Sequence, residues 1–147
     1  MKRLLASLFL LALGVSYANA QGPQSLCYTT NGVNCVPAVQ ASNSVAISVS
    51  TATTTEVIPL VSGKRIYVTS WDIIAGGTGT ITIKYGTGSS CGTGTTSLTG
   101  AYPLIAQAGI VKGNGLGAVL FVPAGNALCI TTSAAVQMSG SLSYVQF

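Results

Sequence analysis

Apolar and small polar residues alternate with a period of two in several segments of the chain. The clearest example is 44–50, in which Val45, Ile47 and Val49 are separated by serine and alanine. The segment 80–85 repeats the pattern with isoleucine and threonine. Because successive side chains of a β-strand point to opposite faces of a sheet, this alternation predicts strands that each bury one face.

Shorter β-rich runs between turn sequences predict further strands. Residues 56–61 contain Pro59, which restricts them to an edge or bulged strand because proline cannot donate a ladder hydrogen bond. The strand at 64–71 is predicted to place Ile66, Val68 and Ser70 on one face and Arg65, Tyr67, Thr69 and Trp71 on the other. Other strands are expected at 118–122, 127–132 and 136–147, with Gly140 as a bulge or crossing point. The glycine-rich residues 86–100 are expected to form a long loop.

The number and spacing of these segments predict an all-β domain over residues 44–147. About eight short strands follow one another at intervals of roughly 8–15 residues, with turn sequences between them. Such a pattern is typical of an antiparallel sandwich, a jelly roll or a barrel. The one weak helical candidate, 104–111, contains Gly109, which disfavours a helix.

The N-terminal residues have the pattern of a secretory signal peptide. Lys2 and Arg3 precede an apolar run at 4–15, and an Ala-x-Ala cleavage sequence ends at Ala20. The apolar run is shorter than the roughly 20 residues that a membrane span needs. We predict that residues 1–20 are removed on export, which makes the mature chain periplasmic or extracellular, without a membrane span.

Four cysteines follow the predicted signal peptide, and an even number in an exported chain predicts two disulfides. Three connectivities are possible, of which we favour Cys27–Cys35 and Cys91–Cys129. The first pair brackets Asn31-Gly32, a strong turn signal, so residues 21–43 are expected to contain a disulfide-bonded hairpin. The second pair would join the glycine-rich loop to a strand.

Charged residues make up 5% of the sequence, whereas about 25% is usual. So few charges provide little repulsion between copies in solution, and an assembly that hides surface fits this composition well. We therefore predict a homo-oligomer. Beyond the signal peptide, Lys64 and Arg65 are the only adjacent cations, which gives no footprint for nucleic acid.

Few side chains in this sequence are suited to catalysis. There is no histidine, and Glu56 and Asp72 are the only carboxylates. Ser90 stands in a G-x-S-x-G pattern at 88–92, but no histidine exists to activate it. A metal site is equally unsupported, since the chain has neither a CxxC motif nor a histidine. We predict no enzyme activity, no catalytic residue, no metal and no cofactor.

The best candidates for a ligand or interface site are Trp71, Tyr67 and Arg65, which the alternation places on one face of one strand. Aromatic side chains can stack on sugars, and they also pack in cores and interfaces. A cell-surface glycan is therefore an alternative partner, with the loop at 86–100 as a further contributor.

Several segments resemble small phage-associated virion or accessory proteins. They are SGKRIYVTS at 62–70, YGTG at 85–88, LTG at 98–100, PAGNALC at 123–129 and the stretch 136–147. The resemblance covers about residues 45–147. It implies a jelly-roll-like unit that assembles, as a trimer or within a larger particle, and it brings no catalytic residues.

The predicted signal peptide departs from this likeness, because virion parts are normally assembled in the cytoplasm, where disulfides are rare. Taken together, the sequence predicts an antiparallel two-sheet sandwich of jelly-roll type. Its predicted role is that of an exported, non-catalytic structural or interaction protein that self-assembles, such as a phage-related surface or virion component. The alternative is a secreted glycan-binding module.

Overall fold

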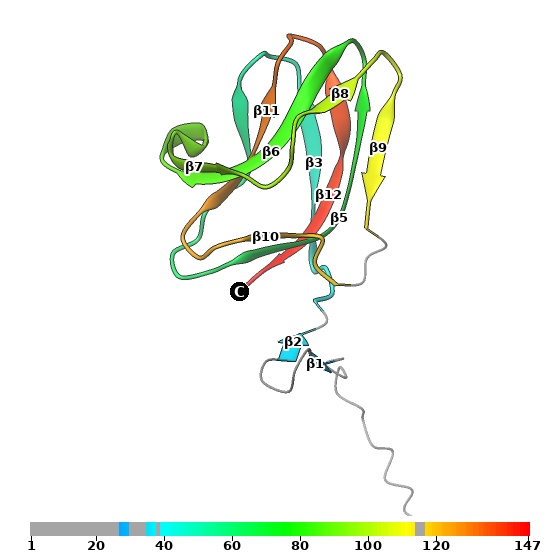
Figure 1. Cartoon of the computed structure of the whole chain (residues 1–147). Helices are drawn as coiled ribbons and strands as arrows, with labels where there is room; N and C mark the ends of the chain where they lie inside the picture. The colour runs from blue at the N-terminus through cyan, green and yellow to red at the C-terminus, as the bar shows by residue number, and fades with distance from the viewer. Residues whose placement is uncertain (1–26, 30–34, 38, 114–116) are drawn as a thin grey trace, which may run out of the picture.

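Two five-stranded antiparallel sheets face each other and form the body of the molecule (Figure 1). The structure is a computed structural model. It describes residues 27–29, 35–37, 39–113 and 117–147. The predicted signal peptide at 1–20 lies outside the described residues.

The all-β prediction is confirmed. The first sheet contains β3 (Asn43–Val49), β5 (Ile66–Ala75), β9 (Gly109–Lys112), β10 (Leu120–Val122) and β12 (Met138–Gln146). The second sheet contains β4 (Thr54–Ile58), β6 (Gly79–Thr87), β7 (Thr93–Ser97), β8 (Tyr102–Leu104) and β11 (Ala127–Thr132). A 3-10 turn, η1 (Ser89–Cys91), precedes β7, and β1 (Cys27–Thr29) pairs with β2 (Cys35–Pro37) in a separate hairpin.

The strand pairing is that of a jelly roll. The first strand of the sandwich, β3, pairs with the last, β12, and the second, β4, pairs with the second-last, β11. In the same nested order, β5 pairs with β9 and β10, and β6 pairs with β7 and β8. β9 and β10 follow one another along the same edge of β5, as β7 and β8 do along β6. The ten strands therefore fill eight positions, in agreement with the predicted number of about eight and with the two-sheet architecture of jelly rolls.

The core lies between the sheets and is built from the alternating residues of the strands. Ile47 and Val49 of β3 and Ile81 and Ile83 of β6 are buried, while their neighbours on the same strands are exposed or partly exposed. Buried residues of β5, β11 and β12 belong to the same cluster, among them Ile66, Val68, Ile73, Leu128, Ile130, Met138 and Leu142. Removing these side chains from water is the main favourable contribution to folding.

A β-bulge in β5 overturns the predicted face of Trp71. Ser70 pairs with Ser143 and Val68 pairs with Tyr144, which leaves Thr69 as an extra residue. The bulge shifts the alternation by one, so Trp71 lies in the core with 2% of its surface exposed. Thr69 is fully buried, and its hydroxyl donates a hydrogen bond to the carbonyl oxygen of Ser143.

Two other strand predictions meet different outcomes. β4 is an edge strand that ends just before Pro59 and has a register shift at Val57, so the expectation of an edge or bulged strand is confirmed. Gly140 is not a bulge, because it pairs regularly with Ile47 and Ile73. It is a point of close approach, where a Cβ atom would overlap the carbonyl oxygen of Asp72.

The prediction of a continuous loop at 86–100 is wrong. β6 continues to Thr87, and residues 93–97 form β7, which pairs with β6. The alternation of apolar and polar residues could not predict β7, because every side chain of this glycine- and threonine-rich strand is exposed and none forms an apolar face.

The N-terminal hairpin is confirmed at the level of the backbone. Thr29 pairs with Cys35 and Cys27 with Pro37. The side chains of the two cysteines and the turn at 30–34 lie outside the described residues, so the Cys27–Cys35 disulfide stays a prediction.

Candidate functional site

A disulfide fixes η1 on the outer face of the second sheet. Cys91 is bonded to Cys129 of β11, as predicted, with their Cα atoms 6.3 Å apart. Both cysteines and Ala127 are buried in a small cluster apart from the main core, and η1 contacts β4, β6 and β11. This face of the sandwich is therefore partly covered by the chain itself.

The turn that carries Ser90 has no hydrolase geometry. Ser90 and Cys91 have φ angles of 50° and 57°, in the left-handed region, and Ser90 is exposed. A nucleophile elbow places its serine between a strand and an α-helix. Here Ser90 lies in a short 3-10 turn, and its neighbour Cys91 is held by the disulfide.

The two carboxylates lie on opposite sides of the molecule. Glu56 is on β4 of the second sheet, beside Cys129 on the outer face. Asp72 is on β5 of the first sheet, where it accepts a hydrogen bond from the hydroxyl of Ser141. Since paired acid catalysis of glycoside cleavage needs carboxyl groups about 5–10 Å apart, these two groups cannot act together across the core.

The outer face of the first sheet is a lattice of small, mostly uncharged side chains. Its central row runs from Ala46 through Ser141 and Asp72 to Val111. The rows on either side are Ser48, Ser139 and Ile74, and Ser44, Ser143 and Ser70. Asp72 is the single charged residue in these three rows, while Ile74 and Val111 are 58% and 76% exposed.

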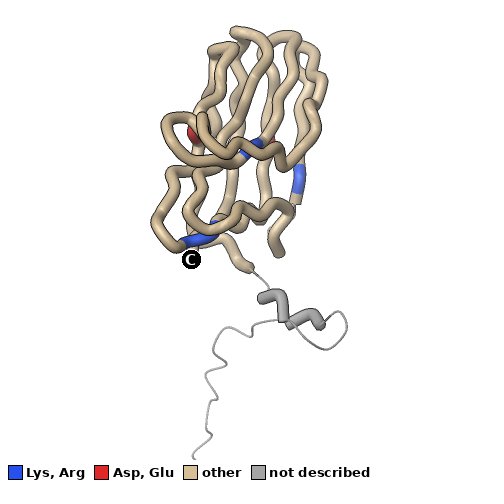
Figure 2. The backbone as a smooth tube through the Cα atoms, turned by 60° about the vertical axis from the view of Figure 1, so that its left-hand side comes forward, with Lys and Arg blue, Asp and Glu red and all other residues tan. Residues whose placement is uncertain are grey.

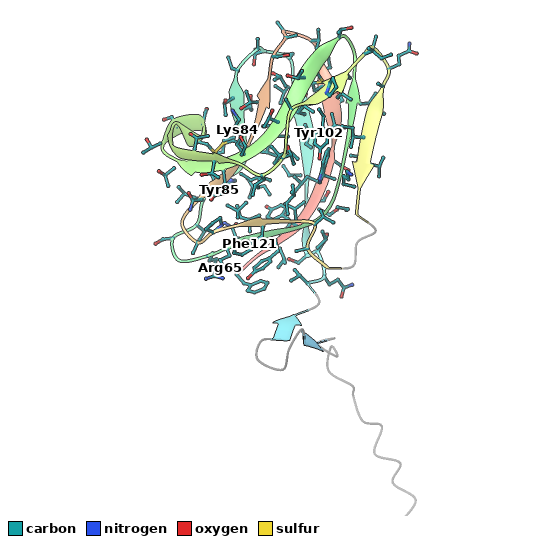
Figure 3. The ribbon with its side chains drawn as sticks, viewed as in Figure 1. Arg65, Lys84, Tyr85, Tyr102 and Phe121 are labelled. Atoms are coloured by element: carbon teal, nitrogen blue, oxygen red, sulfur yellow. A yellow bond between two sulfur atoms is a disulfide. The ribbon has the colours of Figure 1, made fainter. Side chains whose placement is uncertain are left out.

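Aromatic side chains gather at one end of this face. Tyr67 lies opposite Phe121 in the register, with ring centroids 5.4 Å apart, and stacks on Phe147 at 4.8 Å. The Arg65 guanidinium lies 5.5 Å from the centroid of the Phe121 ring, and Figure 3 shows these two side chains together. Phe121 and Phe147 are about half exposed, so the cluster offers apolar surface beside a cation.

A cleft of about 380 Å³ opens between the two sheets, where the edge strands are interrupted. One wall comes from the link between β7 and β8 and the other from the break between β9 and β10. The lining residues are Trp71, Leu98, Thr99, Gly100, Tyr102, Lys112, Val119 and Leu120. The rings of Trp71 and Tyr102 lie 6.0 Å apart and are tilted by 48°.

The structure separates the three residues predicted to form one site. Arg65 and Tyr67 belong to the aromatic cluster on the outer face, whereas Trp71 lines the cleft. The cleft does bring Trp71 together with part of the predicted loop, through Leu98 and Thr99. Nothing in the local sequence marks Phe121 as a partner of Tyr67, because that contact depends on the pairing of β10 with β5.

In the part of the chain that the structure describes, no group of three or more acidic, cysteine or histidine residues is placed to hold a metal ion. No helix in that part is long and apolar enough to cross a membrane. No protein-family model matches the chain, and a comparison with curated proteins found no match.

Proposed function

We propose that this chain is an exported, non-catalytic structural protein that assembles with copies of itself, as in a phage-related surface or virion component. The observation that carries the proposal is the outer face of the first sheet. This face is open, consists mostly of small side chains and is nearly free of charge. Ile74 and Val111 add exposed apolar surface to this face, and contiguous exposed apolar surface is a common mark of an interaction site.

The distribution of charge supports this proposal. Figure 2 shows that the few charged residues of the described chain are scattered, apart from the neighbours Lys64 and Arg65. Copies of a monomer with so little charge repel one another only weakly, so little prevents them from associating. Jelly rolls occur in viral capsid proteins as well as in lectins and cupins, so the fold is compatible with assembly.

Export is supported by two features of different kinds. The Cys91–Cys129 disulfide is of a type that persists in oxidising compartments, and the sequence begins with a signal-peptide pattern. The absence of a catalytic role is supported by the placement of Glu56 and Asp72 in different sheets and by the lack of histidine in the sequence.

Light scattering coupled to size-exclusion chromatography tests the proposal on the mature chain, residues 21–147. We expect a closed oligomer whose mass stays constant on dilution. Ile74→Lys, in the row of the open face next to its central row, should reduce the size of the assembly, whereas Thr82→Lys, on the second sheet, should leave it unchanged. A wild-type chain that is monomeric at high concentration would refute the proposal.

The cleft supports a second candidate, a glycan-binding module. Its volume falls within the range of about 300–1,000 Å³ that is usual for small-ligand sites. Trp71 and Tyr102 provide aromatic surface, and Thr99 and Lys112 provide polar groups. Sugars are commonly bound by this combination of ring stacking and a few hydrogen bonds.

Retention on a panel of immobilised polysaccharides tests the second candidate. Tyr102→Ala and Lys112→Ala should abolish retention, and Tyr85→Ala, outside the cleft lining, serves as the control. Trp71→Ala is unsuitable here, because the buried indole also supports the core. Wild-type chain that elutes unretained from every polysaccharide would eliminate this candidate.

A further inference from the structure

The edges of a β-sheet are places where another chain can pair, because each edge strand presents unpaired backbone N–H and C=O groups. The sandwich has four such edges. In the first sheet they are β3 on one side and β9 with β10 on the other. In the second sheet they are β4 on one side and β7 with β8 on the other.

Three of the four edges carry features that discourage pairing. β4 has the charged Glu56, a bulge at Val57 and Pro59 immediately after its end. The edge formed by β7 and β8 is interrupted and contains Pro103. The edge formed by β9 and β10 is also interrupted, and it has Lys112 at the break. Charges, prolines, bulges and short strands are the usual means of protecting an edge.

β3 has none of these features. Its seven residues, Asn43–Val49, include no charge, no proline and no glycine, and they pair with β12 without a register shift. β-branched Val45, Ile47 and Val49 give it a strong strand preference. Within the described chain, β12 is the one strand that pairs with β3, so the opposite edge of β3 is open there.

The side chains of β3 are suited to pairing with an identical strand. Ala46 is the central residue of the strand, and Ser44 and Ser48 flank it on the outer face. If two copies pair antiparallel over the whole strand, Ala46 lies opposite Ala46 of the partner subunit, and Ser44 lies opposite Ser48 of the partner subunit. All of these contacts are small and uncharged. The half-buried Val45 would gain cover from the facing strand.

We propose that β3 pairs antiparallel with β3 of a second copy, about a two-fold axis that passes beside Ala46. The first sheets of the two copies would then form one continuous sheet, and their open outer faces would become one larger face. Such an isologous contact closes after two copies. The inference rests on the proposed self-assembly and names the strand that makes one of its contacts.

Disulfide cross-linking tests the register directly. Directly opposite residues in antiparallel strands have Cα atoms about 4.5–5.5 Å apart, within the range that a disulfide spans. Ala46→Cys should therefore form a covalent dimer, identified by non-reducing peptide mapping. Ser48→Cys is the matched control, because the two copies of residue 48 would lie roughly 14 Å apart and cannot be bridged.

A charge substitution provides a second test that does not depend on thiol chemistry. Ala46→Lys would place like charges opposite each other and should weaken the contact, whereas Thr82→Lys, on the second sheet, should not. Circular dichroism establishes that both variants fold. The expected result is that Ala46→Lys alone halves the assembly.

The outcomes separate this inference from the proposed function. A wild-type oligomer that neither cross-links through Ala46→Cys nor responds to Ala46→Lys would overturn the β3 contact and leave self-assembly standing. A trimeric wild-type chain whose Ala46→Cys variant forms no cross-link would likewise overturn the β3 contact and leave self-assembly standing. A monomeric wild-type chain would overturn both, and protection from hydrogen exchange of the β3 amides that point away from β12 would show that the chain itself covers the edge in that monomer.

Discussion

Phe147 stacks on Tyr67, with ring centroids 4.8 Å apart and ring planes 16° from parallel. The backbones of Arg65 and Phe147 exchange two hydrogen bonds, of 2.8 and 3.2 Å, which hold the two rings in this position. These hydrogen bonds extend the pairing of β12 with β5 beyond Gln146 and Ile66, and they bring Phe147 into the aromatic cluster.

Replacing Phe147 by alanine should lower the free energy of unfolding by about 1 kcal/mol, since aromatic pairs contribute about 0.5–1.5 kcal/mol beyond the area they bury. Phe147→Leu keeps most of the apolar surface without the ring and should recover part of the loss. Urea denaturation measures both values. Equal stability of the alanine variant and the wild type would mean that the stack contributes nothing in solution.

The double variant Cys91→Ala/Cys129→Ala should lose roughly 2–4 kcal/mol, because the bond closes a loop with a sequence separation of 38 residues. The bond links a turn to the outer face of one sheet rather than one sheet to the other. The fold should therefore survive. Hydrogen exchange should increase mainly in η1 and β7, and a general increase throughout β5 and β12 would contradict this local role.

Gly140→Ala should be strongly destabilising, by about 2 kcal/mol or more, because its Cβ would overlap the backbone of β5 at Asp72 and Ile73. Gly100→Ala is the matched control, since a Cβ at Gly100 meets nothing within 4 Å and Gly100 has no positive φ. Thermal unfolding of the two variants should differ clearly. Similar melting temperatures would show that β12 and β5 can separate enough to admit the extra methyl group.

Trp71→Ala should cost about 3–5 kcal/mol, the range for removing a large buried aromatic side chain. Tyr67→Ala, on the opposite face of the same strand, should cost less, because Tyr67 is partly exposed. Denaturant titration compares the two. If Tyr67→Ala proved the more damaging change, the face assignment that follows from the bulge at Thr69 would have to be abandoned.

The regular strands could be predicted from the sequence because their burial alternates strictly. Val45, Ile47 and Val49 predicted the inward face of β3, and the prediction of a Cys91–Cys129 bond was confirmed. The face of a regular strand follows from the local sequence pattern, and four cysteines allow only three disulfide connectivities. Sequence alone was sufficient for the fold class for the same reason.

The candidate sites could not be predicted in the same way. A single extra residue, Thr69, moves Trp71 from the outer face into the core, and nothing in the local sequence marks the bulge. The cleft joins Leu98 to Lys112 and Leu120 across two breaks in the edge strands. Such contacts depend on how distant strands pair, which composition and periodicity do not reveal.

The position of β12 has a consequence for when this protein can fold. It lies between β3 and β5, so the strand that comes last in the chain order completes the middle of the first sheet. Until residues 138–146 have been synthesised, β3 has no neighbour in that sheet and both of its edges are exposed. Long-range pairing of this kind is slow to form. The first sheet therefore cannot be completed, and β3 cannot be incorporated into it, before residues 138–146 have left the ribosome.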